Sequence, residues 1–167
     1  MTNNKRFESL YKTYFSRVYS YFSLCFDPHR AQDLAQQTFL NVWKALARSE
    51  MWNGHIENER AWIFRIAVNV KNDELRKKQR RPPTQELIET LSDSQSSQET
   101  MVESAQIAAA FAQLSLEDRE ILLMKNMGLT SREIAEVLRI CASTVRSRIS
   151  GARERFSQIL IKKGVEV

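Results

Sequence analysis

Apolar residues recur at helical spacing over most of the chain. In residues 6–22 and 30–46 they return every three or four positions, which is the pattern of a helix with one buried side. The residues of these two stripes are Phe7, Leu10, Tyr11, Tyr14, Val18 and Phe22 in the first segment, and Leu34, Phe39, Val42 and Leu46 in the second. Asp27 and Pro28 separate the segments. The pattern predicts an all-α protein.

The second of these segments also carries a polar face. Asp33, Gln36 and Gln37 lie on it, away from the apolar stripe. This face holds a single charge, whereas a solvated helix face usually holds more. The pattern favours a surface that meets a protein partner. An ordinary solvated face is the alternative interpretation.

A third helical segment, residues 59–81, combines an apolar side with a polar ridge. Trp62, Ile63, Ile66, Ala67 and Val70 form the apolar side, and the ridge at 4-3-4-4 spacing is formed by Arg65, Asn69, Asn72, Arg76 and Arg80. The segment ends in RKKQRR, which includes Lys77 and has the charge density of a nucleic-acid patch. The preceding loop, residues 51–58, contains Trp52 and Asn53. Aromatic and amide groups beside a basic helix suit the unstacked bases of a single strand.

Two more helical patterns near the C-terminus are separated by residues 139–141. Thr130 and Glu133 give the first a capping box, T-x-x-E. The second has an apolar stripe that consists of Val145, Ile149, Ala152 and Phe156. This order predicts a helix-turn-helix, in which side chains near the start of the second helix reach bases in the DNA major groove. The candidates for DNA contact are Arg132, Ser143, Thr144, Arg146, Ser147 and Arg148.

The charge is unevenly distributed along the 167 residues, whose net charge is +5. Residues 1–81 hold 15 Lys and Arg against 8 Asp and Glu, and residues 105–167 hold 10 against 7. Residues 82–104 hold none against 5, open on two prolines and are rich in Ser, Gln and Thr. That composition is typical of a linker with little packed structure. We therefore expect two small helical domains, residues 1–81 and 105–167, joined by an acidic linker, residues 82–104.

Other kinds of chemistry find little support in the sequence. No apolar run reaches membrane-spanning length and no signal-peptide core is present, so we expect a soluble, cytosolic protein without membrane insertion. Cys25 and Cys141 are far apart, which argues against a disulfide, and Pro28 interrupts the i, i+4 pair of Cys25 and His29 that a metal site would need. Without a Gly-rich phosphate loop or a Ser/His/Asp set, we expect no metal, no cofactor and no enzymatic activity.

Three segments together resemble one protein family. DLAQQTFLNVWKAL resembles the core-polymerase-binding segment of bacterial sigma factors, and RAWIFRIAVNVKNDELRKKQRR resembles their minus-10-recognising helix. The stretch LSLEDREILLMKNMGLTSREIAEVLRICASTVRSRISGARERF is similar to their minus-35-reading domain. The three occur in the family's order and cover nearly everything except the linker. With two domains only, the chain is similar to the extracytoplasmic-function (ECF) group of the sigma-70 family.

The resemblance implies a role for each predicted surface. Asp33, Gln36 and Gln37 would bind core RNA polymerase, whose contact regions would be the clamp of the β′ subunit and the β flap. The ridge and the 51–58 loop would hold the melted minus-10 strand, and the helix-turn-helix would bind the minus-35 element of promoter DNA. The acidic linker residues Asp93, Glu99 and Glu103 would occupy the polymerase's RNA path. An anti-sigma factor is implied as a further partner.

The sequence departs from the family pattern at three positions. An acidic residue is frequent where Gln37 stands, so the charge complementarity to polymerase is altered there. A glycine is usual in the turn at Arg139, where a left-handed backbone would be costly for arginine. A serine commonly caps the recognition helix where Cys141 stands, and cysteine is a poorer cap.

Two other functional classes fit parts of the sequence. One is a repressor or activator that uses the same helix-turn-helix on duplex DNA without polymerase. The other is an enzyme, which the sequence gives little reason to expect. A free-standing regulator would protect a promoter alone, whereas a small sigma factor would need core enzyme to do so.

Overall fold

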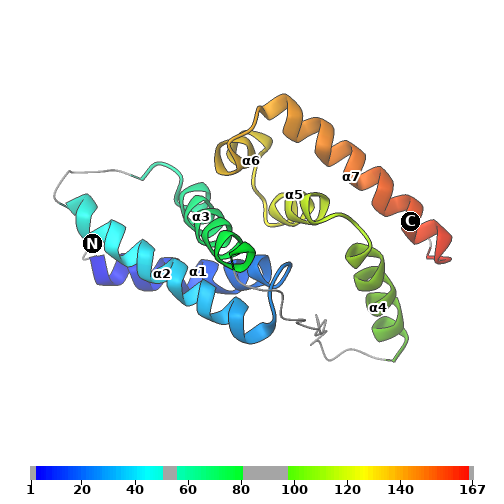
Figure 1. Ribbon diagram of the computed structural model, residues 1–167, viewed down its shortest axis with the longest axis horizontal. Coiled ribbons are helices and arrows are strands. Elements are labelled where there is room, and N and C mark those ends of the chain that lie inside the picture. The colour runs from blue at the N-terminus through cyan, green and yellow to red at the C-terminus, as the bar shows by residue number, and fades with distance from the viewer. Residues whose placement is uncertain (1–2, 51–55, 81–97, 166–167) are drawn as a thin grey trace. The chain divides into compact units, whose positions relative to one another are not determined.

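The structure, a computed structural model, describes residues 3–50, 56–80 and 98–165, and its regular elements are all helices. The all-α prediction is confirmed. The chain divides into two compact units, with α1 to α3 in the first, and α4, α5, α7 and most of α6 in the second (Figure 1). The helices are α1 (Asn3–Phe22), α2 (Pro28–Glu50), α3 (Glu59–Gln79), α4 (Gln98–Ala112), α5 (Leu116–Asn126), α6 (Ser131–Leu138) and α7 (Ala142–Lys162).

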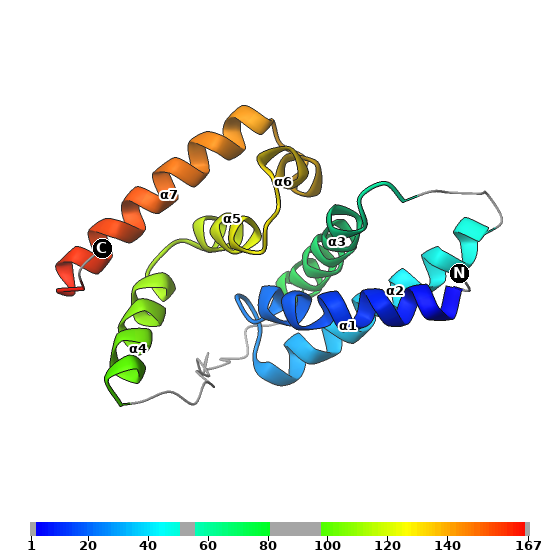
Figure 2. The same ribbon diagram turned by 180° about the vertical axis from the view of Figure 1, so that it is seen from behind.

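The first unit is a three-helix bundle with an aromatic core. Helices α1 and α2 lie side by side, and α3 packs on both (Figure 2). All four predicted core residues of α2 are buried, as are Leu10, Val18 and Phe22 of α1. Tyr11, which the stripe also placed in the core, is 37% exposed because it belongs to an aromatic cluster at the edge of the bundle, where its ring lies 5.0 Å from that of Phe39.

Local sequence signals set where these helices begin. Pro28 opens α2, at the position where its missing N–H costs nothing, and the carboxylate of Asp27 accepts a hydrogen bond from the backbone N–H of Arg30. That hydrogen bond lowers the pKa of Asp27. The side chain of Asn58 caps α3 by accepting from the N–H of Ala61. The turn between α1 and α2 thus falls where the sequence predicted it.

The second unit is organised around α7, on which α4 and α5 pack. Val145, Ile149 and Ala152 are buried, which confirms the stripe predicted for this helix. Phe156 is half-buried, with its ring 5.9 Å from that of Phe111 at an edge-to-face angle of 83°. Residues of α5, α6 and the loop between them, including Ile121, Met124, Leu129 and Ile134, complete the core.

Helix α4 begins inside the segment that composition assigned to the linker. Its first residue is Gln98, whereas the linker was expected to extend to residue 104. Alanine has the highest helix propensity of all residues, and α4 is rich in alanine after residue 104. This alanine-rich stretch favours a helix, and the helix continues toward the N-terminus into the more polar residues that begin at Gln98. Residues 82–97 lie outside the described residues, so the assignment of a linker to them stays a prediction.

Two features of the described residues bear on other functions. None of their helices is both long enough and apolar enough to cross a membrane. Within the same residues, no group of three or more His, Cys, Asp or Glu side chains is placed to hold a metal ion.

Candidate polymerase-binding and DNA-binding surfaces

The predicted partner face of α2 is exposed. The side chains of Asp33, Gln36 and Gln37 lie at the surface, while Leu34 and Ala35 between them are buried. The amide Nε2 of Gln37 donates to Oδ1 of Asn41, 3.1 Å away on the next turn. The three polar side chains therefore form one accessible patch, in which the sole charge is that of Asp33.

An ion pair that the sequence did not predict fixes α2 to α3. The guanidinium of Arg30 donates through Nε to Oε1 of Glu74 at 2.9 Å, and its Nη2 lies 2.7 Å from the same oxygen. The Glu74 side chain is only 6% exposed. Nη1 of Arg30 also lies 3.8 Å from Oδ2 of Asp33. Arg30 thus connects the partner face of α2 with the buried side of α3.

A polar groove follows from this arrangement. It has a volume of about 570 Å³ and is lined from α2 by Asp33, Gln37 and Asn41, and from α3 by Asp73 and Lys77, among others. The partner face and the basic end of α3 therefore border the same depression in the first unit.

The polar ridge of α3 faces solvent as predicted. Arg65, Asn69, Arg76 and Arg80 are exposed, as is Lys77, while Asn72 is half-buried. The opposite side is buried through residues such as Ile63, Ala67 and Val70. Nη1 of Arg76 donates to Oδ1 of Asp73 at 3.1 Å, so part of the ridge charge is neutralised within the helix. The loop candidates Trp52 and Asn53 lie outside the described residues.

Some basic residues of α3 do not belong to the ridge. Lys71 is buried, with its ammonium 5.5 Å from the centre of the Tyr21 ring. Lys78 of the RKKQRR run is half-buried, with its ammonium 5.1 Å from the centre of the Phe26 ring. Both contacts are of the cation–π type. The cationic surface of α3 is consequently smaller than the sequence run indicates.

Helices α6 and α7 and residues 139–141 form the predicted helix-turn-helix. The capping box is confirmed, because the N–H of Thr130 donates to the Glu133 carboxylate at 2.6 Å and the N–H of Glu133 donates to the Thr130 hydroxyl at 3.2 Å. Arg139 has φ of 56°, the one positive φ among the described non-glycine residues. The turn therefore takes the left-handed conformation that favours glycine, and arginine adopts it at an energetic cost.

The start of α7 lacks one stabilising contact. Cys141 occupies the N-cap with an extended backbone, and its side chain makes no capping hydrogen bond. The weak cap predicted from the sequence is confirmed. The first amides of the recognition helix, next to its DNA-binding candidates, are left without a side-chain partner at this position.

Most of the minus-35 candidates are accessible. Ser143, Arg146, Ser147 and Arg148 on α7 and Arg132 on α6 are exposed, and Thr144 is half-buried. They differ in their neighbours, because Nη1 of Arg148 lies 3.9 Å from a carboxylate oxygen of Glu117 at the start of α5. Arg148 is thus held partly toward the protein.

A second unpredicted ion pair fixes α5 to α7. Arg155 donates to both carboxylate oxygens of Asp118, from Nε at 2.7 Å and from Nη2 at 2.8 Å. Hydrogen bonding from Arg155 lowers the pKa of the Asp118 carboxyl. Gly151 leaves room for this guanidinium, since a Cβ there would lie 3.1 Å from Nη1. The pair holds the recognition helix against the helix that precedes the motif.

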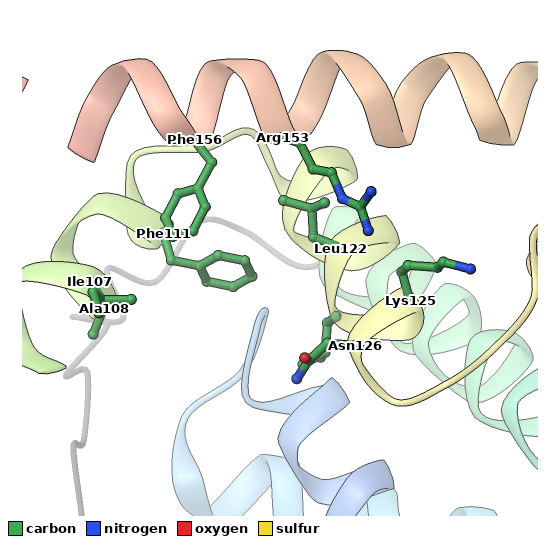
Figure 3. Close-up of a pocket in the computed structure, with 9 residues that line it drawn as sticks. Ile107, Ala108, Phe111, Leu122, Lys125, Asn126, Arg153 and Phe156 are labelled. Atoms are coloured by element: carbon green, nitrogen blue, oxygen red, sulfur yellow. The ribbon is translucent and has the colours of Figure 1, made fainter. Parts of the chain in front are cut away.

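An apolar pocket lies between α4, α5 and α7 (Figure 3). Its volume is about 790 Å³, and its lining includes Ile107, Phe111, Leu122 and Phe156. Figure 3 shows the two aromatic rings beside each other, and Arg153 and Lys125 at the other end of the pocket. An apolar lining is unsuited to a nucleic acid, and none of the predicted minus-35 residues lines this pocket.

The fold and these surfaces define a helical DNA-binding protein with a helix-turn-helix in its second unit. The model of sigma-70 region 2 matches residues 7–81, and that of sigma-70 region 4 matches residues 104–156. The chain is 30% identical over 151 residues to the RNA polymerase sigma-H factor of Pseudomonas aeruginosa. The aligned stretch covers 80% of this chain and 75% of that protein. The chain is 32% identical over 147 residues to the ECF RNA polymerase sigma factor EcfG of Rhodopseudomonas palustris, with 86% and 78% covered.

Solved structures agree at the level of the fold. CnrH, in complex with the cytosolic domain of CnrY, is 23% identical with a TM-score of 0.65, over 95% of this chain and 90% of that one. The sigma factor RpoE of Bartonella quintana, in complex with the anti-sigma factor NepR, is 21% identical with a TM-score of 0.70, over 93% and 97%.

The chain belongs to the ECF group of the sigma-70 family. It is a sigma factor that directs transcription initiation with RNA polymerase and binds DNA through its helix-turn-helix. Sigma factors are not enzymes, so the enzymatic alternative falls away. Family membership also decides against the free-standing repressor or activator.

Proposed function

We propose that the exposed face of α2 is the docking surface for core RNA polymerase, at the clamp region of its β′ subunit. The observation that carries this proposal is the exposure of Asp33, Gln36 and Gln37 on a helix whose neighbouring residues are buried. A face with one charge loses little hydration when it is covered by a protein. The β flap is expected to contact the second unit, and the protein acts in the cytoplasm with its polymerase.

The ridge of α3 is proposed to hold the melted minus-10 strand, together with Trp52 and Asn53 of the preceding loop. Four of its five members are exposed, so they are accessible to phosphates and bases. The start of α7 is proposed to enter the minus-35 major groove, where Ser143, Thr144 and Ser147 present hydroxyls and Arg146 presents a guanidinium. Arg132 and Arg148 complete the set.

A pull-down of core polymerase tests the docking surface. Asp33→Lys combined with Gln36→Lys reverses the charge of the face, and we expect it to abolish retention of core enzyme. Ser16→Lys combined with Ser20→Lys is the matched control, because both serines are exposed on α1 and the variant also adds positive charge to the first unit. Equal retention by both double variants would refute the assignment of the α2 face.

An anti-sigma factor is proposed as the regulator of this chain. CnrH and RpoE, which share its fold, were solved with CnrY and NepR, and the second is an anti-sigma factor. A single partner that contacts both units would cover the faces needed for polymerase, with the part of the predicted linker that precedes α4 as the tether between them. If such a partner controls the protein, overexpression in the native host should raise the target transcripts. If the target transcripts do not rise and no inhibitor co-purifies with the overexpressed chain, control by sequestration would be contradicted.

A further inference from the structure

The two flanks of α7 differ in how their arginines are partnered. Residues seven apart lie on the same side of a helix, so Arg148 and Arg155 share one flank and Arg146 and Arg153 share the other. On the first flank, Arg155 makes its two hydrogen bonds to Asp118, and Arg148 lies near Glu117. The acidic start of α5 therefore neutralises the arginines of that flank.

The other flank forms an open basic pocket. It has a volume of about 290 Å³ and is lined by Lys125, Ser131, Arg146, Ile149, Ser150 and Arg153, with no acidic residue among them. Lys125, Arg146 and Arg153 make no ion pair and no side-chain hydrogen bond with any other residue that the structure describes. Figure 3 shows that Arg153 extends from α7 toward α5, the helix that carries Lys125. Three cations and two hydroxyls thus converge without a protein anion.

We propose that this basic pocket binds a phosphate group of the promoter DNA backbone beside the minus-35 element. The inference rests on the proposed insertion of α7 into the major groove. Guanidinium, ammonium and hydroxyl groups are the donors that contact DNA phosphates, and such contacts set the register of a protein on the duplex. A helix in the major groove has a strand backbone along its flank, and this flank is the one whose charge remains free.

The pocket gives roles to residues that the sequence did not select. Lys125, Ser131, Ser150 and Arg153 become phosphate-binding residues. Arg146, which the sequence selected for DNA contact, positions α7 on the backbone instead of reading a base. Sequence discrimination then falls on the outward side chains at the start of α7, such as Ser143 and Ser147.

The salt dependence of promoter binding by the complete holoenzyme tests the proposal. We expect Lys125→Gln combined with Arg153→Gln to reduce the slope of log K against log salt by about 0.9, the value for the loss of one phosphate contact. Promoters with native and with altered minus-35 sequences should lose affinity by the same factor. Lys162→Gln combined with Lys163→Gln is the matched control, because these lysines are exposed at the end of α7 outside the pocket, and its slope should equal that of the wild type.

Two results would overturn the proposal. One is a slope for the pocket variant equal to that of the control, which would also arise if the pocket served an acidic protein segment. The other is a changed ratio between native and altered promoters, which would indicate base contact. Lys125→Arg combined with Arg153→Lys preserves the charges and should keep the wild-type slope, which separates charge from folding. If the wild-type holoenzyme itself ignored the minus-35 sequence, the proposed function of α7 would fail instead.

Discussion

Replacing Arg139 by glycine should stabilise the helix-turn-helix. Arg139 is exposed and holds φ of 56°. A residue with a Cβ pays about 1–2 kcal/mol for the left-handed conformation. Glycine avoids that cost but loses about 0.5–1 kcal/mol more backbone entropy on folding. The difference predicts that Arg139→Gly raises the free energy of unfolding of the second unit by about 0.5–1 kcal/mol.

Amide hydrogen exchange in the full chain measures this effect locally. A gain of about 0.7 kcal/mol should slow exchange of the amides of α6 and α7 by about threefold if they exchange through opening of the unit. Arg139→Ala removes the same charge and side chain but keeps the Cβ, so it should give no such gain. Gly128, with φ of 90°, supplies the opposite control, because Gly128→Ala should speed exchange.

One outcome would show that the backbone at Arg139 is not strained. If Gly128→Ala speeds exchange while Arg139→Gly and Arg139→Ala behave alike, the left-handed backbone at position 139 carries no net strain. The stability of the turn would then depend on what the arginine side chain contacts. In that case the departure from glycine at this position would be neutral for the fold.

Three further predictions concern caps and ion pairs. Arg155 lowers the pKa of Asp118, so their ion pair stabilises the second unit at pH values above the unfolded pKa of about 4, and this contribution is lost as the pH falls through the lower folded pKa. In the Asp118→Asn variant, the free energy of unfolding should therefore fall less steeply at acidic pH than in the wild type. An equally steep fall in both proteins would count against a stabilising pair. Cys141→Ser should add a capping hydrogen bond and raise the free energy of unfolding, measured in urea, by about 1 kcal/mol. A lower free energy of unfolding would show that the cysteine makes a contact that stabilises the protein more than the cap would. Arg30→Met should destabilise the first unit by about 1–3 kcal/mol because it leaves the buried Glu74 carboxylate without its cation, and a thermal midpoint equal to that of the wild type would contradict this.

Features that depend on local sequence were predictable. The stripes of α2 and α7, the capping box at Thr130 and the weak cap at Cys141 all follow from residues within one or two helical turns of each other. The exposure of the partner face of α2 follows in the same way, since a helix that buries one side must show the other. The family resemblance extended these local patterns to functions.

Features that depend on packing between distant segments were not predictable. Arg30 meets Glu74 across 44 positions, and Arg155 meets Asp118 across 37. Periodicity shows which side of a helix is polar, but not which cation on that side will find a carboxylate. For this reason Arg146 and Arg148 looked alike in the sequence, whereas only Arg148 lies near an acidic residue among those the structure describes. The early start of α4 was missed because polar composition suggested a linker.

Run-off transcription with core RNA polymerase and genomic DNA, followed by sequencing of the transcript starts, tests directly whether this chain is a promoter-specific sigma factor. We predict that the wild-type chain directs core enzyme to a defined set of starts preceded by shared minus-10 and minus-35 elements. The chain alone should leave the same DNA unprotected in a footprint. Protection of duplex promoters without polymerase, or transcript starts that do not change when the chain is added, would contradict this role as a sigma factor.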